Sequence, residues 1–216
     1  MFSLEQKNKI DKLLDSFKSS DMTDLDLSWM ALEYLPEELT SFTTIQNLNL
    51  NGNRLTKLPE FVFQLDNLKT LNLANNALTS LSDSIESLTH LESLNLSNNN
   101  LKKLSNKVFK LKELVFLDIS GNNLEEIPSD IAFLKNLIIF NADNNILSEL
   151  PENFGNLKHL EILNIYNNNF KTFPENLLFL KNLKHLNFSN NQITAIPCDI
   201  IRLESLIYLN IGNNKI

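Results

Sequence analysis

The sequence contains a single cysteine, Cys198, among its 216 residues. One thiol cannot form a disulfide within the chain, so the disulfide framework of many small extracellular domains is excluded. Glycine is also scarce, with 4 residues in all, and none of them forms a glycine-rich loop for phosphate groups. These two absences exclude a disulfide-stabilised scaffold and the common nucleotide-binding motifs.

Positive charge and long apolar runs are limited as well. The chain has 19 Lys and Arg against 26 Asp and Glu, a formal net charge of −7. An acidic chain is a poor ligand for nucleic acid or an anionic membrane, so we expect neither as a partner. No segment is apolar for long enough to span a bilayer, and the N-terminus does not have the pattern of a signal peptide. We therefore expect a cytoplasmic protein, with delivery into a host cell by a signal-independent route as the alternative.

What the sequence has is a strict period. Apolar residues recur every 23 positions without a slip, and Met22 occupies the same place one period before the first of them. The series is Ile45, Leu68, Leu91, Leu114, Leu137, Leu160, Leu183 and Leu206. A fixed period of this length indicates a solenoid, in which each repeat packs against its two neighbours.

One repeat, residues 114–136, shows the plan of all. Leu114, Leu117 and Ile119 alternate as a short strand with one buried face, and Pro128 bends the chain into an irregular or short helical return. The pattern resembles the leucine-rich repeat, LxxLxLxxNxLxxLPxxIxxLxx. Its length and its Leu-Pro step are similar to the intracellular, plant-intracellular Ras-group-like class of that family.

The resemblance implies an α/β fold. It would be a right-handed, horseshoe-shaped leucine-rich-repeat solenoid with a parallel concave β-sheet. Residues 22–216 would form eight full repeats and a truncated ninth. Such proteins present one long open surface, so the resemblance implies recognition of a partner protein.

A column of asparagines occupies one place in every repeat except the first, where Met30 replaces it. A buried amide is costly unless its donors and acceptors are paired, and a stacked column allows each side chain to bond the backbone of neighbouring turns. The resemblance implies such a structural ladder. Its members are Asn53, Asn76, Asn99, Asn122, Asn145, Asn168, Asn191 and Asn214.

The two ends of the chain differ from the repeats. Residues 1–21 are interpreted as an amphipathic helical cap on the first repeat, because a capping-box pair, Ser3 and Gln6, precedes an apolar stripe at helical spacing. The alternative is a detachable segment for a partner or membrane. The last repeat stops at Ile216, halfway through its period, which leaves a strand edge open. The chain is then a fragment, a homodimer through this edge, or a protein that tolerates it.

The outward strand positions predict where a partner binds. One column is small and polar as far as Ser93 and apolar or aromatic from Phe116 onward, and an adjacent column is apolar in part. Apolar surface with aromatic anchors is typical of interaction sites, and five strands at about 4.8 Å spacing span roughly 19 Å. The predicted partner-binding residues are Val115, Phe116, Ile138, Ile139, Ile162, Tyr166, His185, Ile207 and Tyr208. The next outward column is almost entirely Asn, and we expect it to bond polar groups of the partner.

A second apolar set lies on the return segments. It comprises Phe61, Phe63, Phe109, Phe133, Phe154 and Phe179. Packing between successive repeats is the favoured interpretation, with a convex binding surface as the alternative.

No constellation of catalytic residues accompanies the repeats. His90 and His159 hold the same place in distant repeats, too far apart to share a metal, and Cys198 lies across the unit from His185. We therefore predict no enzyme activity, no metal and no cofactor. The expected function is a non-catalytic scaffold that binds a protein through the concave face of its C-terminal half. The alternatives are a homo-oligomer through the C-terminal edge and an adaptor, for example a bacterial effector, that recruits substrates to an enzyme on another chain.

Overall fold

The computed structural model describes Lys12 and residues 23–216. In this part of the chain, nine short strands form one parallel sheet in sequence order. Consecutive strands pair with a constant offset of one repeat, so that Phe116 lies opposite Ile139 and Ile139 opposite Ile162. The strands are β1 (Asp24–Asp26), β2 (Asn47–Asn49), β3 (Thr70–Asn72), β4 (Ser93–Asn95), β5 (Phe116–Asp118), β6 (Ile139–Asn141), β7 (Ile162–Asn164), β8 (His185–Asn187) and β9 (Tyr208–Asn210). The predicted parallel solenoid is confirmed.

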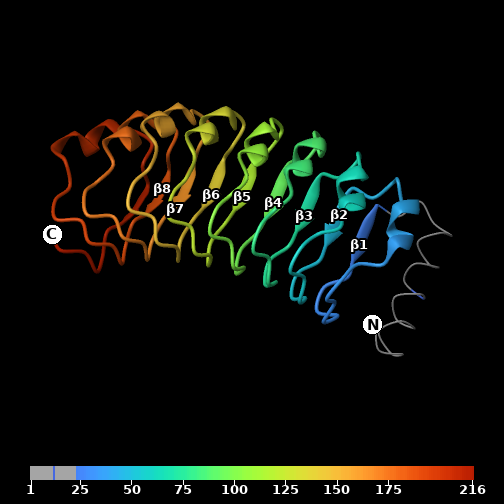
Figure 1. The fold of residues 1–216 in the computed structure, drawn as a ribbon. Coiled ribbons are helices and arrows are strands. Elements are labelled where there is room, and N and C mark those ends of the chain that lie inside the picture. The colour runs from blue at the N-terminus through green and yellow to red at the C-terminus, as the bar shows by residue number, and fades with distance from the viewer. Residues whose placement is uncertain (1–11, 13–22) are drawn as a thin grey trace.

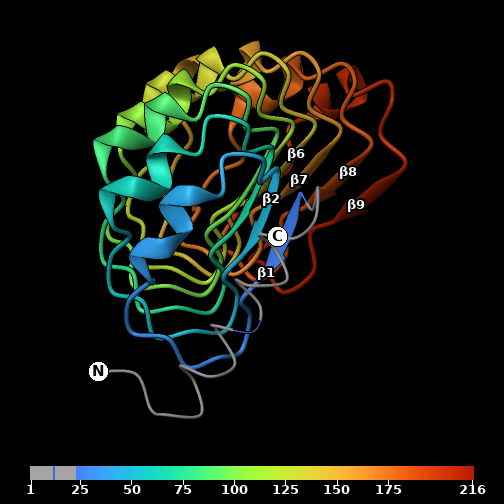
Figure 2. The same ribbon diagram turned by 90° about the vertical axis from the view of Figure 1, so that its right-hand side faces the viewer.

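A five-residue 3-10 helix follows each of the first eight strands. The helices line the outer, convex side of the curved stack, and the sheet lines its inner side (Figure 1). Seen from the end, the strands and helices occupy opposite sides of the coil (Figure 2). The helices are η1 (Glu37–Ser41), η2 (Glu60–Gln64), η3 (Asp83–Ser87), η4 (Asn106–Lys110), η5 (Ser129–Phe133), η6 (Glu152–Asn156), η7 (Glu175–Phe179) and η8 (Cys198–Arg202).

Proline begins most of these helices, and serine begins two. Pro128, with φ of −58°, is the N-cap of η5, where its missing N–H costs no hydrogen bond. Before η3 and η4 the N-caps are Ser82 and Ser105, whose hydroxyl oxygens accept hydrogen bonds from the N–H groups of Ser84 and Lys107. A side-chain cap thus replaces the fixed proline backbone in these two repeats.

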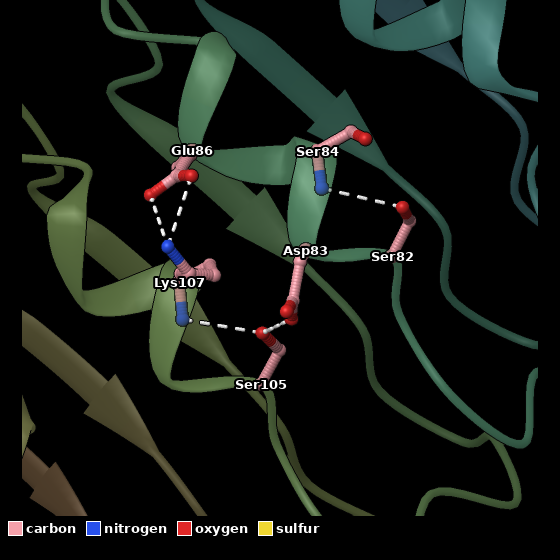
Figure 3. A network of polar contacts seen from close by, with 6 residues as sticks. All are labelled: Ser82, Asp83, Ser84, Glu86, Ser105 and Lys107. Atoms are coloured by element: carbon pink, nitrogen blue, oxygen red, sulfur yellow. Dashed lines mark hydrogen bonds and ion pairs between the residues drawn. The ribbon is translucent and has the colours of Figure 1, made fainter.

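Polar contacts also join η3 to η4 on the convex side (Figure 3). The Ser105 hydroxyl donates to an Asp83 carboxylate oxygen at 2.6 Å, and Lys107 Nζ lies 2.9 Å from Glu86 Oε2. The Glu86 carboxylate, by its hydrogen bond and its charge, raises the pKa of Lys107. These contacts lie at the surface, so their contribution to stability is small.

The core is one continuous apolar cluster along the stack. Leu114, Leu117 and Ile119, which the sequence places on the buried side of a strand, are fully buried. Larger rings fill the same layer in later repeats, where Phe170 and Phe188 meet edge to face with centroids 5.0 Å apart. Each repeat therefore buries its apolar face only by contact with its neighbours.

The asparagine column bonds the backbone throughout. Asn122 is 7% exposed; its Nδ2 donates to the carbonyl oxygens of Leu96 and Ile119, and its Oδ1 accepts from the N–H of Leu101. In every member of the column, Oδ1 accepts the N–H of the residue 21 positions earlier in the preceding repeat. The column thus links each turn to the one before it.

The position just before each ladder asparagine has left-handed backbone. It is occupied by glycine or a second asparagine, the residue types that tolerate positive φ. Gly52 has φ of 69°, and an added Cβ there would clash with the Trp29 ring. The Asn-Asn pairs of the sequence therefore combine two separate backbone requirements. Members with positive φ are Gly52, Asn75, Asn98, Gly121, Asn144, Asn167, Asn190 and Asn213.

The helical cap predicted for residues 1–21 lies, apart from Lys12, outside the described residues. In the part of the chain that is described, no helix combines the length and the apolar character that crossing a bilayer requires.

Candidate partner-binding face

Five of the predicted binding residues form one straight row across β5 to β9. Parallel pairing makes Phe116, Ile139 and Ile162 direct neighbours, and the row continues through His185 to Tyr208. The same row begins with polar residues, and Ser93 pairs directly with Phe116. The change from polar to apolar residues seen in the sequence therefore occurs between neighbouring strands of one continuous sheet surface. We call these five residues the apolar row.

The side chains of the apolar row differ in exposure. Phe116, Ile139 and Ile162 are half-buried, so each rests on its neighbours and still presents part of its surface. Tyr208 is 47% exposed, and its ring centroid lies 6.0 Å from that of His185. The row therefore offers apolar area in its middle and polar ring atoms at its C-terminal end.

A second row runs beside the first. The N–H of Ile138 donates to the carbonyl oxygen of Val115, which places these two half-buried residues side by side just before β6 and β5. The row is then interrupted by an ion pair between Lys184 Nζ and Glu161 Oε2, at 2.8 Å. Ile207, on the far side of this pair, is 78% exposed. The structure thus joins Val115 and Ile138 to the apolar row and separates Ile207 from them.

Tyr166 belongs to a polar cluster at one end of the strands. Its hydroxyl accepts a hydrogen bond from Asn144 Nδ2 at 3.0 Å, and the same nitrogen donates to Asp143 at 2.6 Å. Burial raises the pKa of the Asp143 carboxyl, and the negative charge of Asp118 raises it further. Hydrogen bonds from Tyr166 and Asn144 act in the opposite direction.

Asp143 was not among the predicted site residues. The sequence carries a signal for it, because the same place in other repeats holds small residues such as Ala74, Ser97 and Ser120. Asp143 and Tyr166 occupy this place in two successive repeats, and their larger polar side chains distinguish them from the small residues of the other repeats. Its geometry, with Asp143 only 9% exposed, is visible only in the structure.

The amide column is largely occupied by the protein itself. Oδ1 of Asn95 accepts the N–H of Ser97, and Asp118 accepts that of Ser120, which closes the turn after each strand. Asn164 Nδ2 also donates to Asn141 Oδ1 at 2.8 Å. Many of the side-chain oxygen and nitrogen atoms of this column already form hydrogen bonds within the protein. Only the remaining donors and acceptors could bond polar groups of a partner.

The phenylalanines of the return segments divide into two groups. Phe63, Phe109 and Phe154 are buried between repeats, as predicted, and Phe61 is partly buried against the same core. Phe133 and Phe179 are 54% and 55% exposed on the convex side, so the core interpretation is wrong for these two. Both follow the buried positions of their helices and point outward, which spacing alone did not reveal.

Family models identify the repeats. A model described as a leucine-rich repeat region matches residues 79–168, and one described as leucine rich repeat matches residues 43–101. Two further leucine-rich-repeat models match residues 159–180 and 181–216. With the nine-stranded parallel sheet, these matches show that the chain is a leucine-rich-repeat protein.

Solved structures give the same result. A leucine-rich-repeat protein of Leptospira interrogans is 28% identical with a TM-score of 0.63, over 94% of this chain and 69% of that one. The Arabidopsis receptor kinase HAESA, in complex with the peptide hormone IDA and a co-receptor, is 27% identical with a TM-score of 0.80; the match covers 91% of this chain. The plant peptide hormone receptor RGFR1, in complex with RGF2, is 31% identical with a TM-score of 0.77 over 89% of this chain.

The chain spans 35% of the HAESA chain and 32% of the RGFR1 chain, so it corresponds to about a third of each receptor. No curated protein sequence matches it.

Proposed function

We propose that this protein is a non-catalytic recognition module that binds a partner protein on the sheet side of its C-terminal half. The observation that carries the proposal is the apolar row: three half-buried apolar side chains on adjacent strands, followed by His185 and Tyr208. Apolar area that is continuous across strands, with ring atoms at its margin, matches the composition of interface centres. An extended peptide or one face of a helix fits a row of this length.

The relatives support protein binding as the general role. The HAESA and RGFR1 structures are complexes of leucine-rich-repeat receptors with peptide partners. The binding face and the kind of partner are inferred from the apolar row of this chain alone.

Affinity capture with the double variant Phe116→Asp/Ile139→Asp tests the proposed face. Two carboxylates in the middle of the apolar row would leave charges unpaired against an apolar partner surface, so we expect the captured partner to be lost. The matched control is Thr70→Asp/Ser93→Asp, which adds the same charges to the polar half of the same row. Circular dichroism checks that both variants are folded. Partners retained by the first variant, or lost equally from both, would contradict the proposed face.

The exposed last strand supports a second candidate, self-association. Tyr208 and Leu209 of β9 are 47% and 37% exposed, and Ile207 just before the strand is 78% exposed, so apolar surface is exposed at this edge of the sheet. A second copy packed against β9 would cover it. Light scattering on this chain should then show a dimer that Ile207→Lys converts to monomer, whereas a monomer at every concentration would contradict this candidate.

We also propose a reducing compartment such as the cytoplasm. Cys198, the single cysteine, is exposed and free. An exposed thiol is most compatible with a compartment that keeps thiols reduced.

A further inference from the structure

A column of lysines runs along the turns that lead from the helices into the strands. Its members lie 23 residues apart in four consecutive repeats, and all four are exposed: Lys112, Lys135, Lys158 and Lys181. The same place holds Thr43, Asp66 and Thr89 in earlier repeats and Glu204 in the next. In a chain of net charge −7, positive charge is thus concentrated along one line.

A second side-chain ladder fixes the backbone of this column. Asn136 Nδ2 donates to the carbonyl oxygen of Lys112 at 3.0 Å, and Asn182 Nδ2 donates to that of Lys158 at 2.7 Å. His159 Nδ1 lies 2.9 Å from the carbonyl oxygen of Lys135. Because each bond ties one turn to the next, the lysines are held at the repeat spacing.

An apolar hollow opens beside the first two lysines. It lies between η4 and η5, measures about 330 Å³, and is lined by Phe109, Lys110, Lys112, Phe133, Lys135 and Asn136. The exposed ring of Phe133 is its main apolar surface, and the fully buried Phe109 lies beneath it in the core. Lys110 Nζ lies 5.4 Å from the centroid of the Phe133 ring, within the range of a cation–π contact.

The lysines at this hollow are not neutralised within the described residues, where no ion pair to Lys110, Lys112 or Lys135 is present. Further along the column the ammonium groups are engaged. Lys158 Nζ donates to the carbonyl oxygen of Gly155, and Lys181 Nζ donates to that of Arg202. The first part of the column is therefore the part available to a ligand.

We propose that this hollow binds an acidic peptide segment of a partner protein, in which a large apolar side chain is flanked by carboxylates. The apolar side chain would pack against the exposed ring of Phe133, and the carboxylates would pair with the ammonium groups of Lys110, Lys112 and Lys135 at the rim. A protein segment is favoured over an extended polyanionic surface, because the chain as a whole has a net charge of −7 and would repel such a surface. This site lies on the opposite side from the sheet and is independent of the proposed function.

Fluorescence anisotropy tests the site with a labelled peptide that carries one Phe between runs of Asp and Glu. A second peptide has Ser in place of the Phe. We expect the first peptide to bind about tenfold more tightly than the second, and Lys112→Glu/Lys135→Glu or Phe133→Ser to weaken it by about tenfold or more. The matched control Lys102→Glu/Lys103→Glu makes the same change in net charge on another surface, and should leave the affinity within about twofold of wild type.

Four results would overturn the proposal. Equal binding of the two peptides would show that the apolar hollow is not used, and an equal loss in the control variant would show only a general effect of charge. Binding abolished by Phe116→Asp/Ile139→Asp would place the peptide on the sheet side instead. Vesicles with 30% phosphatidylserine form the lipid arm, and lysine-dependent binding to them without peptide binding would assign the column to a lipid surface.

Discussion

Individual asparagines hold successive turns together in this solenoid. Asn122 receives and donates hydrogen bonds that reach the preceding repeat, and the residue before it, Gly121, has the left-handed backbone that the turn requires. A fully hydrogen-bonded buried amide stabilises the fold because, without it, backbone groups of the same turn would be buried without partners, which is costly.

Replacing Asn122 with Ala should lower the free energy of unfolding by about 1–3 kcal/mol, because it leaves the N–H of Leu101 without an acceptor. It also removes one of the two side-chain amide donors to each of the carbonyl oxygens of Leu96 and Ile119. Urea denaturation measures the change. Asn123→Ala is the matched control, since this neighbouring side chain is exposed and should alter stability by less than about 0.5 kcal/mol. Equal stability of the Asn122→Ala variant and wild type would contradict the structural role.

The buried carboxyl of Asp143 predicts an unusual pH dependence. Its pKa in the folded protein is raised above 3.8 by burial and by Asp118, so between 3.8 and the raised pKa the folded state holds more protons than the unfolded state. This group therefore lowers stability as pH rises through that interval, and the penalty is complete above the raised pKa.

Asp143→Asn should consequently raise the melting temperature at pH 7, because the neutral amide removes the charge that burial disfavours. The gain should shrink as the pH is lowered toward 3.8. Melting curves across this pH range measure it, with Asp66→Asn on the exposed surface as a control that should show no such trend. A variant less stable than wild type at pH 7 would show that the hydrogen bonds of Asp143 outweigh its desolvation.

At the scale of elements, the short helices depend on how they begin. Six N-caps are proline, and the other two are Ser82 and Ser105 with side-chain bonds. Proline restricts the unfolded chain, whereas serine satisfies a free N–H group in the folded one. Proline thus acts mainly on the unfolded state and serine on the folded state. Both residues adopt the same backbone conformation, with φ of −58° at Pro128 and −62° at Ser105.

Ser105→Ala should therefore cost about 0.5–2 kcal/mol, since the N–H of Lys107 loses its acceptor. Ser105→Pro should recover part of this loss, about 0.4–1 kcal/mol, because φ at this position is already −62°. Chemical denaturation of the three proteins compares them. A proline variant less stable than the alanine variant would show that the surrounding backbone cannot accept the ring.

Much of the architecture was predictable from single positions. The strand phase followed from Leu114, Leu117 and Ile119 because a strict period fixes which residues face the core. The pairing of Phe116 with Ile139 followed in turn, because identical repeats stack in register. The exposure of Phe133 and the burial of Asp143 were not predictable, because each depends on the precise direction of a side chain within a repeat rather than on the period.

At the scale of the whole molecule, the repeats are nearly interchangeable. Within residues 23–216, every strand pairs with the strand one repeat away, and neighbouring helices belong to adjacent repeats. Stability should then be close to a sum of repeat and neighbour contributions.

Removal of one complete repeat, residues 114–136, should leave a folded protein in which Ser93 pairs directly with Ile139. We expect the denaturant m-value to fall by about one tenth, since m scales with the surface exposed on unfolding. Removal of residues 114–124 alone is the control, because it breaks the phase of all later repeats and should abolish cooperative unfolding. Loss of the fold in the complete-repeat deletion would show that the repeats are not equivalent neighbours.

The constant spacing of sheet partners also bears on biosynthesis. Each strand from β2 to β9 pairs with a segment 23 residues nearer the N-terminus, which the ribosome has already released. At about 5–20 residues per second, a further repeat is completed every ~1–5 s. The growing chain can therefore add one turn at a time onto the repeats already folded, and each of these strands finds a partner that has already been translated.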